Sequence, residues 1–108
     1  MKIFLDTAVY EDIEKANQSG LIDGVTTNPS LILKSGGDPV ETIRRISGDF
    51  PFFESISAEV VADNALEMVN QAQAFKDMQN VTIKVPLTVE GLKACKLLTS
   101  DGFTVNVT

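Results

Sequence analysis

Short apolar runs alternate with helical patterns along the whole of this 108-residue chain. We expect five strands, over residues 2–6, 24–28, 55–60, 81–85 and 103–108. Between them we expect helices over residues 9–19, 39–47, 64–78 and 89–98, and a short helical turn over 29–33. This alternation is typical of β-α-β units, whose strands form a parallel sheet. The length suits one domain and is too short for two, so we expect a single domain over residues 1–108.

Residues of the N-cap type precede four of the expected helical segments. Asn28 and Asp38 are each followed by a proline, which is favoured at the first helical position. Asp63 and Thr88 precede the two later helices. We expect each of these four residues to be the N-cap of the segment that follows it.

The expected strands carry different residue types on their two sides, because alternate residues of a strand point to opposite faces. One side is aliphatic, as in Val25, Ile56 and Ile83. The other side holds mainly small or polar residues: Lys2, Phe4, Asp6, Gly24, Thr26, Asn28, Ser55, Ser57, Glu59, Thr82, Lys84, Thr104, Asn106 and Thr108. An open sheet covered by helices on both faces needs apolar residues on both. We therefore expect an α/β fold of parallel units from a TIM-type barrel, with the polar side inside.

The composition excludes several classes of function. Histidine is absent, which excludes Ser-His-Asp and Cys-His catalysis and imidazole metal sites. The single cysteine permits no internal disulfide and fits a reducing compartment. Nine basic and fifteen acidic residues, with no basic stretch longer than Arg44-Arg45, argue against nucleic-acid binding. With no apolar signal region or membrane-length apolar run, we expect a cytoplasmic protein without a membrane partner.

Seven polar side chains are expected to converge where the strands end, which is where TIM-type barrels carry their chemistry. They are Asp6, Thr26, Asn28, Glu59, Lys84, Asn106 and Thr108. Lys84 is central, because burial inside a barrel favours the neutral amine, which can attack a ketone or aldehyde to form a Schiff base. Asp6 and Glu59 could share the proton transfers, one directly and one through a water. The amide and hydroxyl groups could bind substrate hydroxyls.

A purely structural interpretation competes for each of these residues alone. A lysine at a strand end commonly extends to solvent or forms a salt bridge. Asp6 and Asn28 could serve only as helix caps. The repetition of polar residues at five consecutive strand ends favours a shared site.

Five segments of the chain resemble the transaldolase family, and together they span nearly its whole length. They are FLDTA (4–8), GVTTNPSL (24–31), SAEV (57–60), TIKVPLTVEGLKA (82–94) and VNVT (105–108). The chain is most similar to the short bacterial and phage-type branch, with the fructose-6-phosphate aldolases as near relatives. The resemblance implies a (β/α)8 barrel and a Schiff-base mechanism that uses neither cofactor nor metal. A dihydroxyacetone unit would pass from a ketose phosphate to an aldose phosphate, as in the pentose phosphate pathway.

The resemblance also implies a role for each candidate residue. Lys84 matches the Schiff-base lysine of the family, and Asp6 matches its acid–base aspartate. Glu59 matches the glutamate that positions the catalytic water in transaldolases. Because the fructose-6-phosphate aldolases carry glutamine there, Glu59 favours dihydroxyacetone transfer over free aldol cleavage. The remaining candidates match substrate-side residues of the family: Thr26, Asn28, Asn106 and Thr108.

The chain departs from the family pattern in its length. A complete barrel of this kind needs roughly 200 residues or more, so we expect a half-barrel truncated in its fifth strand. The family's basic residue that holds the substrate phosphate is absent, and Arg44 and Arg45 do not replace it, because their helix should pack outside the barrel. The first and fifth strands would have unpaired edges. We therefore expect a homo-oligomer in which a second copy completes the sheet.

Other functions stay open from the sequence. A phospho-acceptor signalling domain has this length, but it needs an acidic cluster for Mg²⁺, and only Asp6 and Glu59 stand at strand ends. A half-barrel without a closed, dry site could instead be inactive or marginal and act as a binding or assembly module. Cleavage of the type that fructose-6-phosphate aldolases perform is a further alternative.

Overall fold

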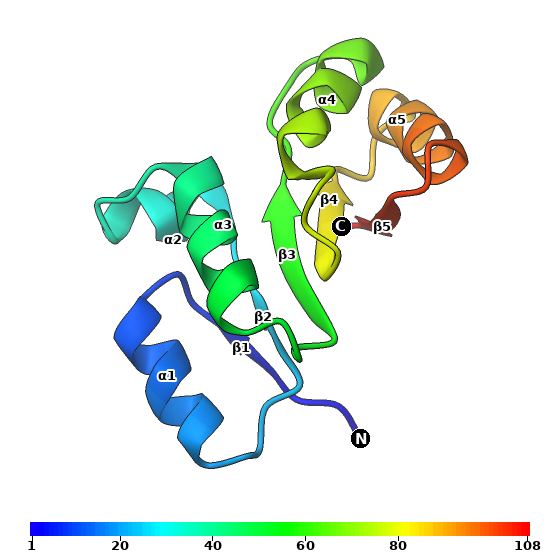
Figure 1. Ribbon diagram of the computed structural model, residues 1–108. Coiled ribbons are helices and arrows are strands. Elements are labelled where there is room, and N and C mark those ends of the chain that lie inside the picture. Colours follow the sequence, from blue (N-terminus) through cyan, green and yellow to red (C-terminus); the bar gives the residue numbers. More distant parts are fainter.

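The five expected strands form one parallel sheet, in the order β1-β2-β3-β4-β5, in a computed structural model that describes residues 1–108 (Figure 1). The strands are β1 (Phe4–Asp6), β2 (Gly24–Thr26), β3 (Ser55–Glu59), β4 (Val81–Val85) and β5 (Thr104–Val107). The helices are α1 (Tyr10–Gln18), α2 (Pro29–Lys34), α3 (Pro39–Asp49), α4 (Ala65–Ala72), the short 3₁₀ helix η1 (Gln73–Phe75) and α5 (Val89–Ser100). The sequential strand order is that of the first five strands of a TIM-type barrel, as the sequence predicts, since a doubly wound sheet reverses its order.

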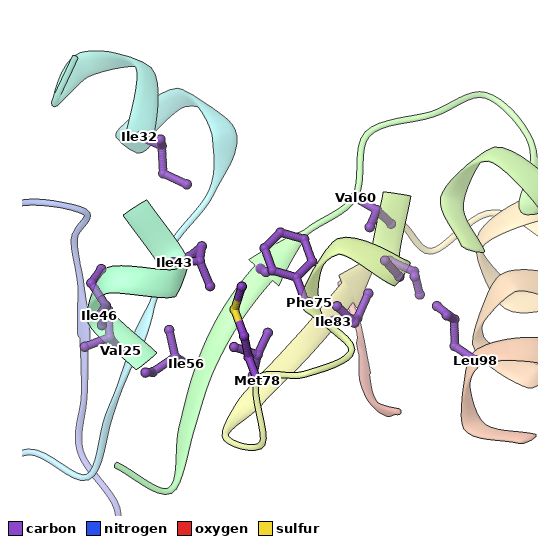
Figure 2. Packing of buried hydrophobic residues seen from close by; sticks show 14 of the residues in the cluster. Val25, Ile32, Ile43, Ile46, Ile56, Val60, Phe75, Met78, Ile83 and Leu98 are labelled. Carbon is purple, nitrogen blue, oxygen red and sulfur yellow. The ribbon is translucent and has the colours of Figure 1, made fainter. Parts of the chain in front are cut away.

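The helices cover one side of the sheet, which we call the outer face and which carries Val25, Ile56 and Ile83. Figure 1 shows the helices following this side from α1 beside β1 to α5 beside β5. The three strand residues are at most 1% exposed and belong to a cluster of 21 buried hydrophobic residues. Ile46 of α3 lies next to Val25 in this cluster (Figure 2). Complete burial of such side chains contributes about 1.5–3 kcal/mol each, so this face holds most of the fold's hydrophobic stabilisation.

The opposite side, the inner face, carries the polar residues of the strands and no layer of helices. Asp6 and Asn106 are exposed, whereas Thr26 and Lys84 are half-buried. Phe4 is the one aromatic residue on this face, and its ring lies over Gly24, where an added Cβ would come within 2.4 Å of the ring. The predicted division between an aliphatic and a polar face is therefore confirmed.

Three of the four expected N-caps are confirmed. The side chains of Asn28, Asp38 and Thr88 accept hydrogen bonds from the backbone of α2, α3 and α5. The prediction for Asp63 is wrong, because α4 is capped by Asn64, whose Oδ1 accepts from the Glu67 amide at 3.0 Å. Asp63 lies one residue too early for its carboxylate to reach that amide.

The expected helix over residues 64–78 is shorter than predicted. Regular α-helix ends at Ala72 and tightens into the 3₁₀ turn of η1. Phe75 and Met78 are nevertheless buried, at 7% and 8% exposed. The hydrophobic spacing therefore continues beyond the helix, which explains why the pattern alone overestimates its length.

Strands β1 and β2 are also shorter than expected, at three residues each. Before β1, the Ile3 amide donates to Asp23 Oδ2 at 2.8 Å, and Lys2 forms an ion pair with Glu54. After β2, the Asn28 side chain is already the cap of α2. Single backbone hydrogen bonds continue beyond both ends of this pair, from the Asp23 amide to Ile3 O at 2.7 Å and from the Thr7 amide to Thr26 O at 3.1 Å, and the side-chain contacts supplement them.

Candidate active site

Lys84 lies near the end of β4, which pairs with β3 on one side and with β5 on the other. Its register partners are Glu59 of β3 and Asn106 of β5. Adjacent strands run about 4.7–4.9 Å apart, so these three inner-face positions are immediate neighbours. Lys84 is half-buried, and the four ion pairs of the structure involve other cations. The ammonium-bearing side chain therefore has no carboxylate oxygen within 4.0 Å, which the competing salt-bridge interpretation would require.

The turn from β4 into α5 begins after Val85, the residue that follows Lys84. Thr88 caps α5 by accepting from the Gly91 amide at 3.0 Å. Gly91 is buried, and a Cβ added there would lie 1.9 Å from the carbonyl oxygen of Pro86. Glycine thus permits the first turn of α5 to pack directly against the residues that follow Lys84. This contact gives a physical reason for the spacing between lysine, proline and glycine in the TIKVPLTVEGLKA segment.

Asp6 and Thr26 form a second group at the ends of β1 and β2. The two residues are register partners, and Thr26 Oγ1 donates to Asp6 Oδ1 at 2.9 Å. Helix α1 begins only at Tyr10, and its N-cap, Val9, makes no side-chain cap bond. The interpretation of Asp6 as a helix cap is therefore wrong. Asp6 is exposed, and its second carboxylate oxygen, Oδ2, accepts no hydrogen bond.

Asn28 has a structural task in addition to its candidate role. Its Oδ1 accepts from the Leu31 amide at 2.9 Å and so caps α2. The cap interpretation is confirmed for this residue. Because the oxygen already accepts the Leu31 amide, the side-chain NH₂ group is the part with no hydrogen bond in the structure, and it can act as a donor to a substrate.

The remaining candidates lie in β3, in β5 and directly after β5. Glu59 is half-buried at the end of β3, beside a cavity of about 560 Å³ between α3 and α4. Asn106 is exposed in β5. Thr108 lies just beyond β5, held by its backbone, since its amide donates to Val85 O at 2.9 Å and its carbonyl accepts from the Leu87 amide at 2.7 Å. All seven predicted residues therefore lie at one end of the sheet.

Two residues of this region were missed by the sequence analysis. Thr27 is completely buried and Ser57 is 4% exposed, and they join β2 to β3 through their hydroxyl groups. A signal was present in the sequence, because Thr27 shares the aliphatic side of its strand with Val25. A hydroxyl at such a position needs a buried hydrogen-bond partner.

The arginines of α3 lie away from the inner face, as predicted. Arg44 Nη1 is 2.9 Å from Asp77 Oδ2, and Arg45 stacks over the Tyr10 ring, with its Cζ 3.8 Å from the ring centre. The Arg44 guanidinium lowers the pKa of Asp77, chiefly through this hydrogen bond. Both arginines thus tie elements of the outer layer together.

No group of three or more acidic or cysteine residues is arranged to hold a metal ion. A phospho-acceptor domain would need such an acidic group for Mg²⁺. The arrangement therefore gives that alternative no support. None of the helices is both long and apolar enough to cross a membrane.

Comparison with known proteins identifies the family of the chain. The family model described as "Transaldolase/Fructose-6-phosphate aldolase" matches residues 3–108. The chain is 52% identical over 109 residues to a "Probable transaldolase" of Sinorhizobium medicae (strain WSM419), and 54% identical over 111 residues to a "Probable transaldolase" of Hyphomonas neptunium (strain ATCC 15444). Each alignment covers 100% of this chain but only 49% and 50% of the relatives, so the chain spans about half their length. The chain belongs to the transaldolase/fructose-6-phosphate aldolase family.

Proposed function

We propose that the chain carries the Schiff-base centre of a transaldolase, a transferase that moves a dihydroxyacetone unit between sugar phosphates. The observation that carries this proposal is the setting of Lys84. The residue is half-buried on the inner face, free of any ion pair, and placed between a carboxylate and an amide in register. The names of the relatives support the same reaction class.

The chemistry begins with attack of the neutral Lys84 amine on the carbonyl carbon of a ketose phosphate. Loss of water gives a protonated Schiff base, which accepts electrons when the bond between the third and fourth carbons breaks. A base removes the proton of the fourth-carbon hydroxyl, and an aldose phosphate leaves. The enamine that remains on Lys84 attacks the aldehyde carbon of a second aldose phosphate, whose oxygen takes a proton. Hydrolysis then releases the new ketose phosphate.

The proton transfers are assigned to the two carboxylates of the site. Asp6 is accessible and oriented by Thr26, which suits it to exchange the proton of the substrate hydroxyl. Glu59 is the register partner of Lys84, which suits it to act through a water on the Schiff base. A carboxylate at this position favours transfer over free aldol cleavage.

The four remaining residues bind substrate in this proposal. Asn28 contributes its NH₂ group as a donor, because its oxygen caps α2. Asn106, Thr26 and Thr108 offer amide and hydroxyl groups on the same end of the sheet. Such groups suit the hydroxyls of a sugar, and the family description, which includes fructose 6-phosphate, favours ketose and aldose phosphates as the substrates. We place the reaction in carbohydrate metabolism, in the pentose phosphate pathway of the cytoplasm.

Borohydride trapping with fructose 6-phosphate tests the proposal. The reductant should fix a dihydroxyacetone-derived adduct on the peptide that contains Lys84, detected by mass spectrometry. Lys84→Met should form no adduct, whereas Lys96→Met, a change at an exposed lysine of α5, should react as the parent does. Absence of an adduct in a folded sample would contradict the proposal and favour an inactive binding or assembly module.

A second measurement separates transfer from cleavage. With fructose 6-phosphate and a four-carbon aldose phosphate as acceptor, transfer yields a seven-carbon ketose phosphate. Accumulation of free dihydroxyacetone would instead indicate cleavage of the fructose-6-phosphate aldolase type.

We further propose that copies of the chain associate. β1 pairs only with β2, and β5 only with β4, so each end of the sheet has an unpaired edge. Edge pairing with a second copy would satisfy these backbone groups and shield the inner face. Light scattering should therefore give the mass of an oligomer, and a compact, folded monomer would contradict this.

A further inference from the structure

The ladder between β2 and β3 ends early. Backbone pairing between these strands stops at Val25 and Ile56. The ladders on either side continue to the level of the candidate site, reaching Thr26 in the pairing of β1 with β2 and Glu59 in the pairing of β3 with β4. β2 and β3 therefore lack a backbone connection where the functional side chains lie.

Two hydroxyl groups replace the missing ladder. The Thr27 amide donates to Ser57 Oγ at 2.8 Å, and Thr27 Oγ1 donates to Ser57 O at 2.8 Å. Ser57 Oγ in turn donates to Thr27 O at 3.3 Å. Each hydroxyl uses its one proton once, so the three bonds are mutually compatible. We call this pair the Thr27–Ser57 clasp.

The surroundings of the clasp make it more than a surface contact. Thr27 is 0% exposed and Ser57 is 4% exposed, so water does not replace a lost partner easily. No buried side-chain oxygen or nitrogen in the structure lacks a hydrogen bond, and the clasp accounts for both of these hydroxyls. Removing either one would leave backbone groups of the other strand unpaired in a dry environment.

The clasp joins the two groups of the candidate site. Thr27 lies between Thr26 and Asn28, and Ser57 lies two residues before Glu59 on the strand that pairs with the one carrying Lys84. A hydroxyl inserted between two backbones also holds them further apart than a direct backbone bond would. The clasp thus bridges the gap between the Asp6 side and the Lys84 side at the level where backbone pairing has stopped.

We propose that Thr27 and Ser57 are positioning residues, which hold the end of β2 at a defined place beside Lys84. The effect of this positioning on catalysis rests on the proposed function. The placement of the strand end itself does not. The two parts can therefore be tested separately.

Amide hydrogen exchange measured by NMR tests the placement and needs no activity. Thr27→Val, which keeps the side-chain shape, and Ser57→Ala should each speed exchange within residues 26–28, above all at the Thr27 amide that donates to Ser57 Oγ, by at least about tenfold. Thr27→Ser restores the hydroxyl and should exchange as the parent does. The amide of Val60, which donates to Lys84 O on the neighbouring ladder, should keep its protection in all variants. Unchanged exchange at residues 26–28 in both disruptive variants would overturn the proposal.

Thr82→Val is the matched control. Ser55 Oγ and Thr82 Oγ1 are 2.6 Å apart and also link two strands, but here the backbone ladder between β3 and β4 is intact. Loss of this hydroxyl should leave exchange at residues 26–28 unchanged. Faster exchange there in Thr82→Val would mean that any lost inter-strand hydroxyl loosens the sheet, and would also overturn the proposal.

The rate of adduct trapping at Lys84 tests the contribution to catalysis. Misplacement by about 1 Å can cost on the order of 100-fold, so the maximal trapping rate should fall about 10- to 100-fold in Thr27→Val, with little change in the half-saturating ketose concentration. Thr27→Ser should restore the rate. A normal rate in a variant with fast exchange would refute the catalytic part. If the parent itself traps nothing, the proposed function fails, and the exchange measurement still decides whether the clasp holds the strand end.

Discussion

The outer face of the sheet buries its aliphatic side chains under helices, whereas the inner face leaves polar side chains open to solvent. Ile83 and Lys84 are consecutive residues of β4 that belong to the two different faces, and Ile83 is 0% exposed while Lys84 is half-buried and unpaired. The alternation of side chains along one strand thus places the residues that stabilise the core on one face and the residues that we assign to the site on the other. None of the residues that we assign to the site belongs to the cluster of buried hydrophobic residues.

Substitution at these two neighbours is expected to give the largest effect and the sharpest contrast. Ile83→Ala should lower the free energy of unfolding by about 2–5 kcal/mol, because it leaves a cavity in the core. Lys84→Met should change it by no more than about 0.5 kcal/mol, because the inner face is open. Urea denaturation of both variants measures the difference. Similar losses in the two would show that the inner face also supports the fold.

Gly91, where the first turn of α5 packs against Pro86, should be the next most sensitive position to substitution. Gly91→Ala places a Cβ against the Pro86 carbonyl and should cost about 1–3 kcal/mol through overpacking. Gly48, in α3, provides the control, since an added Cβ there meets nothing within 4 Å. Gly48→Ala should stabilise the chain by about 0.5–1 kcal/mol. Equal effects of the two alanines in thermal unfolding would mean that the close approach of α5 to β4 is unimportant.

The residue pattern predicted the division between the faces because strand alternation is a local property. Val25 and Ile83 were assigned to the covered side, and Asp6 and Lys84 to the other, from their position in the strand alone. The N-caps of three helices followed from equally local chemistry at Asn28, Asp38 and Thr88.

What the sequence did not predict depends on contacts between distant segments. The Thr27–Ser57 clasp joins residues 30 positions apart, and although the place of Thr27 beside Val25 indicates that its hydroxyl needs a buried partner, nothing in the sequence identifies Ser57 as that partner. The choice of Asn64 over Asp63 as cap depends on which of two adjacent side chains reaches the first turn of α4.

The affinity for phosphorylated sugars tests whether a cation is placed to bind a substrate phosphate at the inner face. Arg44 and Arg45 are engaged on the outer layer with Asp77 and Tyr10, so neither is placed to hold a substrate phosphate. A hydrogen bond to a charged group contributes about 1.5–3 kcal/mol, and without one we expect similar half-saturating concentrations for phosphorylated and unphosphorylated ketoses. Competition in the trapping reaction measures the ratio. Strong selectivity for the phosphate would show that another cation of the chain binds it.

The smallest effect is expected on the outer layer, where Glu90 links α5 to α4. Its Oε1 accepts from the Ala65 amide at 3.1 Å, and its Oε2 is 3.0 Å from Lys93 Nζ. These contacts, the backbone hydrogen bond first, lower the pKa of Glu90 below its ordinary value of 4.5. A carboxyl whose pKa is lower in the folded chain stabilises the fold above its unfolded pKa, and that contribution is lost as the pH falls through the folded value. Glu90→Gln should therefore be slightly less stable than the parent at pH 7 and nearly equal to it at pH 2, as measured by urea denaturation. A difference that persists at pH 2 would mean that the glutamine disturbs packing, and that the link between these helices does not depend on charge.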